Sequence, residues 1–168
     1  MGALYKLCIK GRRIGAGVSR DPIDRFLRGW LGSMDAQRQQ PGLVLVAPPG
    51  SNLVLATDGT LCRTPEPKPR LGGPSVDVFL TSVAAHLGPR AIAVVLSGMM
   101  HDGAPGISAV RRRGGATMAQ HPASAVCDGK PSAAVDLGRA DLMMSLPTLS
   151  QALLILIDGR RLTQPGVR

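Results

Sequence analysis

The chain has 168 residues, of which 44% are hydrophobic but only 2% aromatic, and its formal net charge is +9 at pH 7. The hydrophobic fraction is large enough for a folded core of small aliphatic side chains, which excludes disorder throughout the chain. No apolar run reaches the roughly 18 residues needed to cross a bilayer, and residues 1–10 lack a secretion signal, so the sequence predicts a cytoplasmic protein without membrane insertion.

The cysteines and the positive charge give little indication of a bound metal or nucleic acid. Cys8, Cys62 and Cys127 are far apart and odd in number, so neither a disulfide framework nor a zinc site is predicted. A basic surface suits a phosphate or an acidic protein as partner. Because no aromatic side chains interleave with the basic runs, nucleic-acid binding is not expected.

The first forty residues differ in pattern from the rest. Asp21-Pro22 supplies an N-cap and a first helical position for a short amphipathic helix. Its apolar side chains fall at helical spacing and suit either core cover or a partner surface: Ile23, Phe26, Leu27, Trp30 and Leu31. We therefore expect a basic segment over residues 1–40, a domain over 41–158 and a tail over 159–168.

The part of the domain up to residue 73 has the pattern of antiparallel strands. Strands are predicted over 43–47, 52–56 and 61–63, and the tight turn at Asp58-Gly59 joins the last two as a hairpin. The proline-rich residues 64–73 form an extended loop.

Helices and strands alternate from residue 74 onward. A helix is predicted from Pro74-Ser75 to about His86, ended by Gly88. Further elements are strand 91–96, helix 105–113, strand 116–119, helix 131–137, strand 141–145 and helix 147–157. This order predicts an α/β fold with a mostly parallel, doubly wound sheet, helices on both faces and the antiparallel hairpin at one edge.

Residues 96–106 form a Gly-rich loop between a strand and a helix, and the loop carries a single acid, Asp102. Open α/β sheets place their ligands and chemistry at such junctions. An aspartate just before a helix is also a favoured N-cap. Both interpretations of Asp102 stay open from the residues alone.

Blocks along most of the chain share their order and spacing with one known family. They are Pro41-Gly42, residues 47–50, Asp58-Gly59, residues 74–79, residues 96–106, Gly114-Gly115, Ala119-Gln120, and Pro122 with Ala125. Together these blocks resemble the catalytic domain of the chemotaxis protein-glutamate methylesterases, the CheB family. Several ordered blocks are much more specific than one motif.

The resemblance implies an enzyme that hydrolyses glutamate methyl esters on the cytoplasmic helices of chemoreceptors and releases methanol. The family uses a Ser-His-Asp triad and needs no cofactor or metal. Asp102 matches the triad aspartate, which orients the imidazole. Met99 matches the position whose backbone N–H helps to hold the oxyanion. A response-regulator receiver domain on a separate chain is a further partner that the resemblance implies.

The sequence departs from the family pattern at two places. Met100 stands where the family usually has glycine, which alone tolerates positive φ freely. Ile14-Gly15-Ala16-Gly17 resembles the family's nucleophile turn but has Gly17 in place of the serine, and no histidine precedes His86. We therefore expect an N-terminally incomplete or degenerate methylesterase; the alternative is a catalytically inactive remnant or receptor-binding module of the same fold.

Other candidate residues have ordinary structural interpretations. Ser19 is the nearest substitute nucleophile but lies in a basic loop, and Ser97 is expected to support the acid loop. His101 could line the mouth of the site, whereas His121 and His86 fit a loop and a helix end. The run of arginines at 111–113 closes a helix, where cations suit the dipole, and could also meet acidic receptor helices.

Overall fold

The computed structural model describes residues 51–65 and 74–157 in full, and describes four short strands outside these ranges by their backbone. The helix predicted near residues 23–31, the Gly17 turn and Ser19 lie outside the described residues. The bounds of the expected domain at residues 41 and 158 lie there as well.

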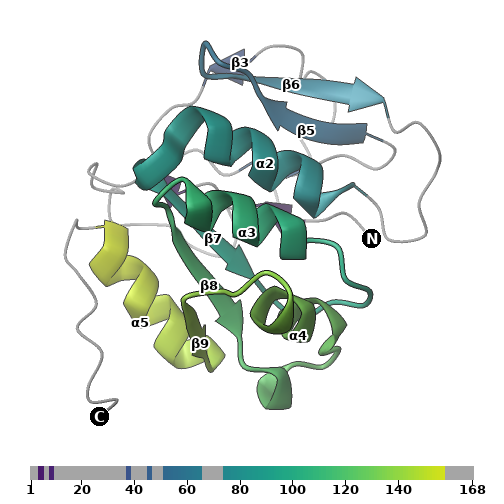
Figure 1. The fold of residues 1–168 in the computed structure, drawn as a ribbon, viewed down its shortest axis with the longest axis vertical. Helices are drawn as coiled ribbons and strands as arrows, with labels where there is room; N and C mark the ends of the chain where they lie inside the picture. Colours follow the sequence, from purple (N-terminus) through teal and green to yellow (C-terminus); the bar gives the residue numbers. More distant parts are fainter. Residues whose placement is uncertain are drawn as a thin grey trace, which may run out of the picture.

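The centre of the fold is a sheet with the strand order β2-β7-β8-β9 (Figure 1). Strands β7 (Ala91–Val95), β8 (Ala116–Gln120) and β9 (Leu142–Met144) are parallel, and β2 (Cys8–Ile9) pairs antiparallel with β7. Helix α3 (Ala104–Arg112) connects β7 to β8, and α4 (Gly129–Asp136) connects β8 to β9. The predicted α/β fold with a mostly parallel sheet is confirmed.

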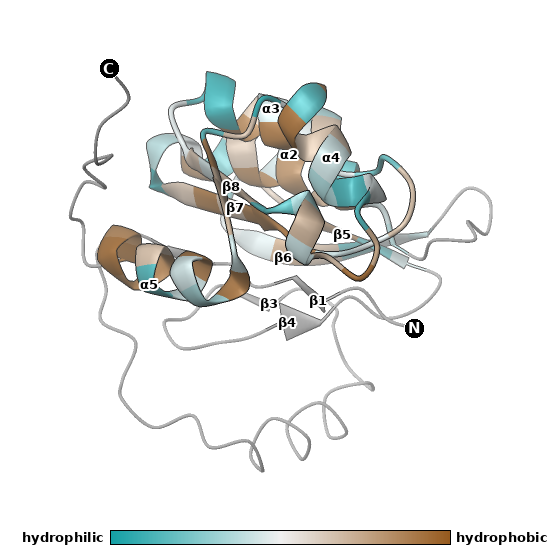
Figure 2. Ribbon diagram, turned by 90° about the horizontal axis from the view of Figure 1, so that it is seen from below, coloured by the Kyte–Doolittle hydropathy of each residue, from teal (hydrophilic) through white to brown (hydrophobic). Residues whose placement is uncertain are grey.

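Alternation along β7 separates two cores. Ala91, Ala93 and Val95 belong to a cluster with α2 (Val76–Leu87) and α3, whereas Ile92 packs with α5 (Leu146–Ile157). Because successive side chains of a strand point to opposite faces, the two clusters lie on opposite faces of the sheet. Figure 2 shows α2 and α3 on one side of β7 and β8 and α5 on the other, which confirms the predicted helices on both faces.

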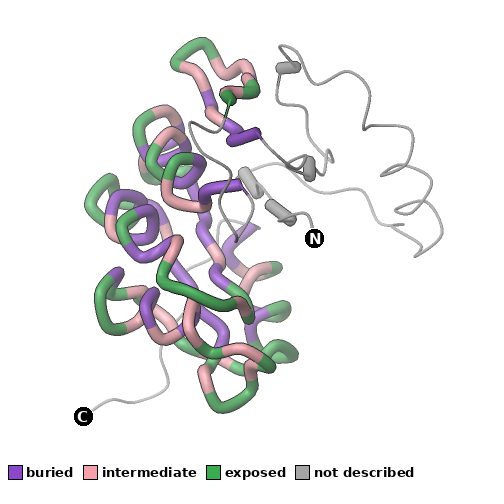
Figure 3. The backbone as a smooth tube through the Cα atoms, turned by 90° about the vertical axis from the view of Figure 1, so that its right-hand side faces the viewer, coloured by how far each residue is buried: buried purple, intermediate pink, exposed green. Residues whose placement is uncertain are grey.

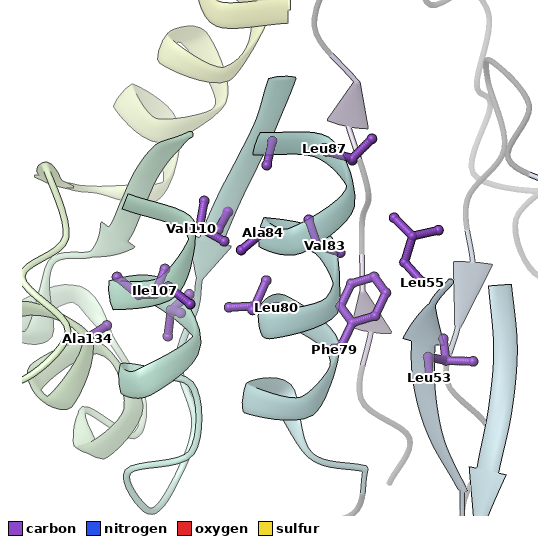
Figure 4. Close-up of a cluster of buried hydrophobic side chains, with 14 of the residues drawn as sticks. Leu53, Leu55, Phe79, Leu80, Val83, Ala84, Leu87, Ile107, Val110 and Ala134 are labelled. Carbon is purple, nitrogen blue, oxygen red and sulfur yellow. The ribbon is translucent and has the colours of Figure 1, made fainter. Parts of the chain in front are cut away.

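Helix α2 lies between the parallel sheet and the hairpin. It begins after Ser75, whose Oγ accepts a hydrogen bond from Val78 N (3.4 Å), and it ends at Gly88, which has a φ of 51°. Phe79 and Leu80 are buried in the cluster that Figure 4 shows, with Leu53 from the hairpin on one side and α3 on the other.

Close contact between α2 and α3 depends on Gly106. A Cβ atom at this position would lie 2.7 Å from Leu80 Cβ, so a larger residue would push the two helices apart. Gly106 therefore fixes how closely the start of α3 approaches α2.

The predicted hairpin is β5 (Ser51–Leu55) and β6 (Thr60–Pro65), closed by a turn in which Gly59 has a φ of 83°. It forms its own sheet in the order β3-β6-β5 with β3 (Gln37–Arg38), rather than pairing with the parallel strands. The hairpin lies beside α2 because its buried side chains Leu53 and Leu55 pack on that helix. Strands β1 (Leu4–Tyr5) and β4 (Leu45–Val46) form a further antiparallel pair.

Burial follows this layering. In Figure 3 the buried parts of the helices and strands alternate with exposed turns, and the loops at the ends of the strands are largely exposed. Among the described residues, no helix is long and apolar enough to cross a membrane. The same residues contain no cluster of three or more metal-ligating side chains.

Candidate active-site loop

The candidate site is the loop that leaves the carboxyl end of β7 and enters α3. Gly103 is the N-cap of α3, with a φ of 118° and no side-chain capping bond. Asp102 therefore does not cap the helix that follows it. Its carboxylate reaches across to the N-terminus of α2 instead.

Asp102 binds the first turn of α2 through both of its oxygens. Oδ2 accepts from Val76 N at 2.8 Å, and Oδ1 accepts from Asp77 N at 3.2 Å and from Ser75 Oγ at 3.1 Å. Ser75 is only 2% exposed, so its hydroxyl is committed to this bond. A carboxylate at a helix N-terminus is stabilised by the unpaired N–H groups and by the helix dipole.

Asp77, in the first turn of α2, in turn binds the N-terminus of α3. Its Oδ1 accepts hydrogen bonds from Gly103 N (3.0 Å) and Gly106 N (2.8 Å). Each helix is therefore capped by a carboxylate from the other's N-terminal region, and this exchange holds the acid loop against α2. Burial raises the pKa of Asp77, the two backbone bonds oppose that rise, and the neighbouring Asp102 charge adds to it.

Lys130 is the cation nearest to Asp102 among the described residues. Its Nζ lies 3.9 Å from Asp102 Oδ2, and both side chains are largely buried, at 18% and 19% exposed. The backbone N of Lys130 donates to Gly98 O at 2.8 Å. A Cβ atom at Gly98 would lie 2.8 Å from Lys130 Cδ, so the lysine side chain passes close over the backbone of the loop.

Ser97 fastens the start of the loop. Its Oγ donates to Cys127 O at 3.2 Å and accepts from Cys127 N at 2.9 Å, while Ser97 N donates to Gln120 Oε1 at 2.9 Å. Gln120 is 2% exposed, and its amide in turn donates to Ser124 O. The expectation that Ser97 supports the loop is confirmed.

The two methionines between Ser97 and Asp102 differ in backbone conformation. Met100 has a φ of 70°, in the left-handed region that favours glycine, and it is 56% exposed. This position is the one at which the sequence departs from the family's glycine. Met99 is 74% exposed, and within the described residues its backbone N–H donates no hydrogen bond. That N–H can therefore donate to an incoming oxygen.

The histidines do not complete a triad within the described residues. All three of the chain's histidines lie there, and none hydrogen-bonds to Asp102. His121 Nδ1 accepts from Ala123 N, His101 is exposed, and His86 lies against Gly59. The described loop thus holds an oriented acid and an unpaired backbone N–H, without a Ser–His pair beside the acid.

Asp77 and Lys130 are the residues of this site that sequence reasoning missed. Their contacts join positions 25 or more residues apart, for which hydrophobic periodicity gives no signal. Asp77 lies in the block of residues 74–79 that the chain shares with the family. This block is the only sign in the sequence that Asp77 has a role beyond its own helix.

A profile of the CheB methylesterase family matches residues 33–153 of the chain. The chain is 42% identical over 147 residues to the protein-glutamate methylesterase FrzG of Myxococcus xanthus, covering 82% of this chain and 44% of that protein. It is 37% identical over 150 residues to protein-glutamate methylesterase/protein-glutamine glutaminase 2 of Cupriavidus metallidurans, with the same coverages. The chain spans less than half the length of these curated relatives.

The fold is similar to a solved structure as well. The CheB methylesterase catalytic domain of Thermotoga maritima superposes with a TM-score of 0.64 at 29% sequence identity, covering 73% of this chain and 66% of that one.

Proposed function

The chain belongs to the CheB methylesterase family, and from this we propose that it acts in the hydrolysis of glutamate methyl esters on chemoreceptors, with Asp102 as the acid of a Ser-His-Asp triad. The relatives named above are protein-glutamate methylesterases, and the matched region includes the whole acid loop. Receptor helices are the proposed partner, and a separate receiver domain is a proposed regulator.

The hydrogen bonding of the Asp102 carboxylate is the observation that carries this proposal. Each carboxylate oxygen has about two acceptor sites. Oδ1 accepts two hydrogen bonds, whereas Oδ2 accepts one short bond and has Lys130 Nζ at 3.9 Å. One acceptor site on Oδ2 is therefore available to an imidazole N–H. The bonds to α2 hold the carboxylate in a fixed orientation, as the acid of a triad requires.

In the proposed reaction, a histidine held by Asp102 takes the proton of a serine hydroxyl as the serine attacks the ester carbonyl. The histidine then returns that proton to the departing methanol, and water hydrolyses the acyl-enzyme in a second, equivalent step. Met99 N–H donates to the oxyanion of each tetrahedral intermediate, which is worth roughly 3–4 kcal/mol in comparable enzymes. No serine–histidine pair lies beside Asp102 among the described residues. All three histidines of the chain are described and none hydrogen-bonds to Asp102, so none of them acts as the base in this arrangement.

The test is methanol release from a methylated chemoreceptor cytoplasmic fragment. Asp102→Asn is compared with Asp136→Asn, which removes an exposed carboxylate at the end of α4. We expect Asp102→Asn to lower kcat by about 10⁴-fold, because the imidazole loses its orientation and charge partner, and Asp136→Asn to leave it unchanged. Equal turnover in wild type and Asp102→Asn would exclude the triad role.

A second candidate function is a receptor-binding module of the same fold without turnover. It is favoured by the fact that Asp102 already has a structural role at the N-terminus of α2 without any histidine beside it. Absence of methanol release from wild-type protein that still binds the methylated fragment would support the module and contradict the enzyme.

A further inference from the structure

Exposed arginines gather at the edge of the parallel sheet opposite Asp102. One precedes β7, a group ends α3 just before β8, and one precedes β9: Arg90, Arg111, Arg112, Arg113 and Arg139. Because the amino ends of parallel strands share one edge, these side chains belong to a single surface, the arginine rim. Helix α3 has nine residues and separates the rim from the Asp102 loop by about 13 Å.

The rim contains a pocket of about 420 Å³, within the size range of ligand sites. Its lining includes Arg111, Arg112 and Arg139, with Asp141 as its one carboxylate. None of the lining residues is aromatic or a large apolar side chain. The chemistry of the pocket is therefore that of guanidinium groups.

The one carboxylate is already engaged. Asp141 Oδ1 accepts from Arg111 Nε at 2.7 Å, and its Oδ2 accepts from Thr117 Oγ1 at 2.6 Å. Arg111 uses only Nε in that bond, and Arg112 uses only Nη1, which donates to Ser108 Oγ at 2.8 Å. Terminal nitrogens of both arginines thus have no partner among the described residues. Guanidinium groups bind carboxylates through such paired donors.

Arg139 occupies a backbone position that favours glycine. Its φ is 55°, and it lies in the C-terminal turn of α4, where Gly138 N donates to Ala133 O and Ala140 N donates to Ala134 O. Helices commonly place a glycine at such a left-handed position. An arginine here is unfavourable for the backbone, and strain of this kind is found at binding sites more often than elsewhere.

We propose that the arginine rim binds an acidic segment of a partner protein, whose aspartate or glutamate carboxylates pair with Arg111, Arg112 and Arg139. We choose an acidic partner because of charge complementarity. The pocket is lined by three guanidinium groups and by one carboxylate, which is already bonded to Arg111. A nucleic acid would find no aromatic side chain in the pocket on which to stack a base. A small apolar ligand would find no apolar wall.

The experiment measures binding of fluorescein-labelled hexaglutamate by fluorescence anisotropy at about 50 mM salt, where exposed charges are weakly screened. Arg139→Gly removes the guanidinium and relieves the backbone, so the variant stays folded. The matched control is Arg63→Gln, which removes one exposed arginine from β6. We expect Arg139→Gly to weaken binding about tenfold while melting no lower than wild type. Arg63→Gln should bind within about twofold of wild type.

Four results would overturn the proposal. Hexaglutamine could bind as tightly as hexaglutamate, which would mean that the carboxylates are not what is recognised. Arg139→Gly and Arg63→Gln could weaken binding equally, which would mean attraction by net charge alone. Oligothymidylate could bind more tightly with the same dependence on Arg139, which would make the partner a nucleic acid. Inorganic phosphate could displace the peptide at equal concentration, which would make the pocket a site for a single oxyanion.

Discussion

The two edges of the parallel sheet use their charged side chains differently. At the carboxyl edge, Asp77 and Asp102 each accept hydrogen bonds from the backbone N–H groups of a neighbouring helix. At the amino edge, Arg112 and Arg139 are exposed, and within the described residues Arg139 has no bonded partner. The carboxylates at one edge hold helices in place, whereas arginines at the other keep donor nitrogens available for a partner.

Helix polarity explains the difference. The helices α2 and α3 begin at the carboxyl edge, where their unpaired N–H groups attract carboxylates, and they end at the amino edge, where cations are favoured. A long arginine side chain is stabilised near a helix C-terminus without a fixed contact. A short aspartate carboxylate must instead sit against the N–H groups that it caps.

The largest effect on stability is expected at Asp102. Asp102→Ala removes the acceptors of the first turn of α2 and leaves the proton of the buried Ser75 hydroxyl without its acceptor, so we expect a loss of about 2 kcal/mol in the free energy of unfolding. Arg139→Gln at the other edge should change it by less than about 0.5 kcal/mol. Urea denaturation at pH 7 measures both, and losses of equal size would contradict the difference between the edges.

A smaller effect of opposite sign is expected at Met100. Met100→Gly relieves the left-handed backbone and removes a side chain that is 56% exposed, for a gain of about 0.5–1 kcal/mol. Met99→Gly is the matched control, since Met99 lies in the same loop without a positive φ and should lose about 0.5 kcal/mol. Thermal melts compare the two, and destabilisation by Met100→Gly would show that the loop does not bear this strain.

The smallest effect, and the one that depends on pH, is expected at Asp77. Because its pKa is raised in the folded state, its contribution to stability is complete below 3.8 and is lost as the pH rises through the folded value. Asp77→Asn keeps an oxygen acceptor for Gly103 N and Gly106 N without the buried charge.

The stability of Asp77→Asn relative to wild type should therefore increase between pH 4 and pH 7. Urea denaturation at both pH values measures this difference, and Asp136→Asn, at an exposed carboxylate, serves as the control. A difference that decreases with rising pH would show that the Asp77 carboxylate is stabilised, not destabilised, by its surroundings.

Much of the fold could be predicted because its signals are local. Ser75 and Gly88 marked the two ends of α2, and the apolar run before Ser97 marked β7 and the loop that follows it. Met100 stands where the family usually has glycine, and the structure keeps a positive φ of 70° at this position. These features depend on a few neighbouring residues, and a single sequence records them.

The exchange of caps between α2 and α3 could not be predicted in the same way. Whether Asp102 caps α3 or α2 depends on how closely the two helices pack. That distance is set where Gly106 contacts Leu80. The place of the hairpin also depends on tertiary packing, because Leu53 and Leu55 bury themselves on α2 rather than beside a parallel strand. Neither contact leaves a periodic pattern in the sequence.

The most direct test of the central claim, that Asp102 is the acid of a methylesterase site, is the ratio of methanol-release rates of wild type and Asp102→Asn. The rates must be measured at a temperature where denaturation curves show both proteins to be folded, since Asp102 also stabilises α2. The account predicts a ratio of about 10⁴. A ratio near one would contradict it and would leave Asp102 with a purely structural role.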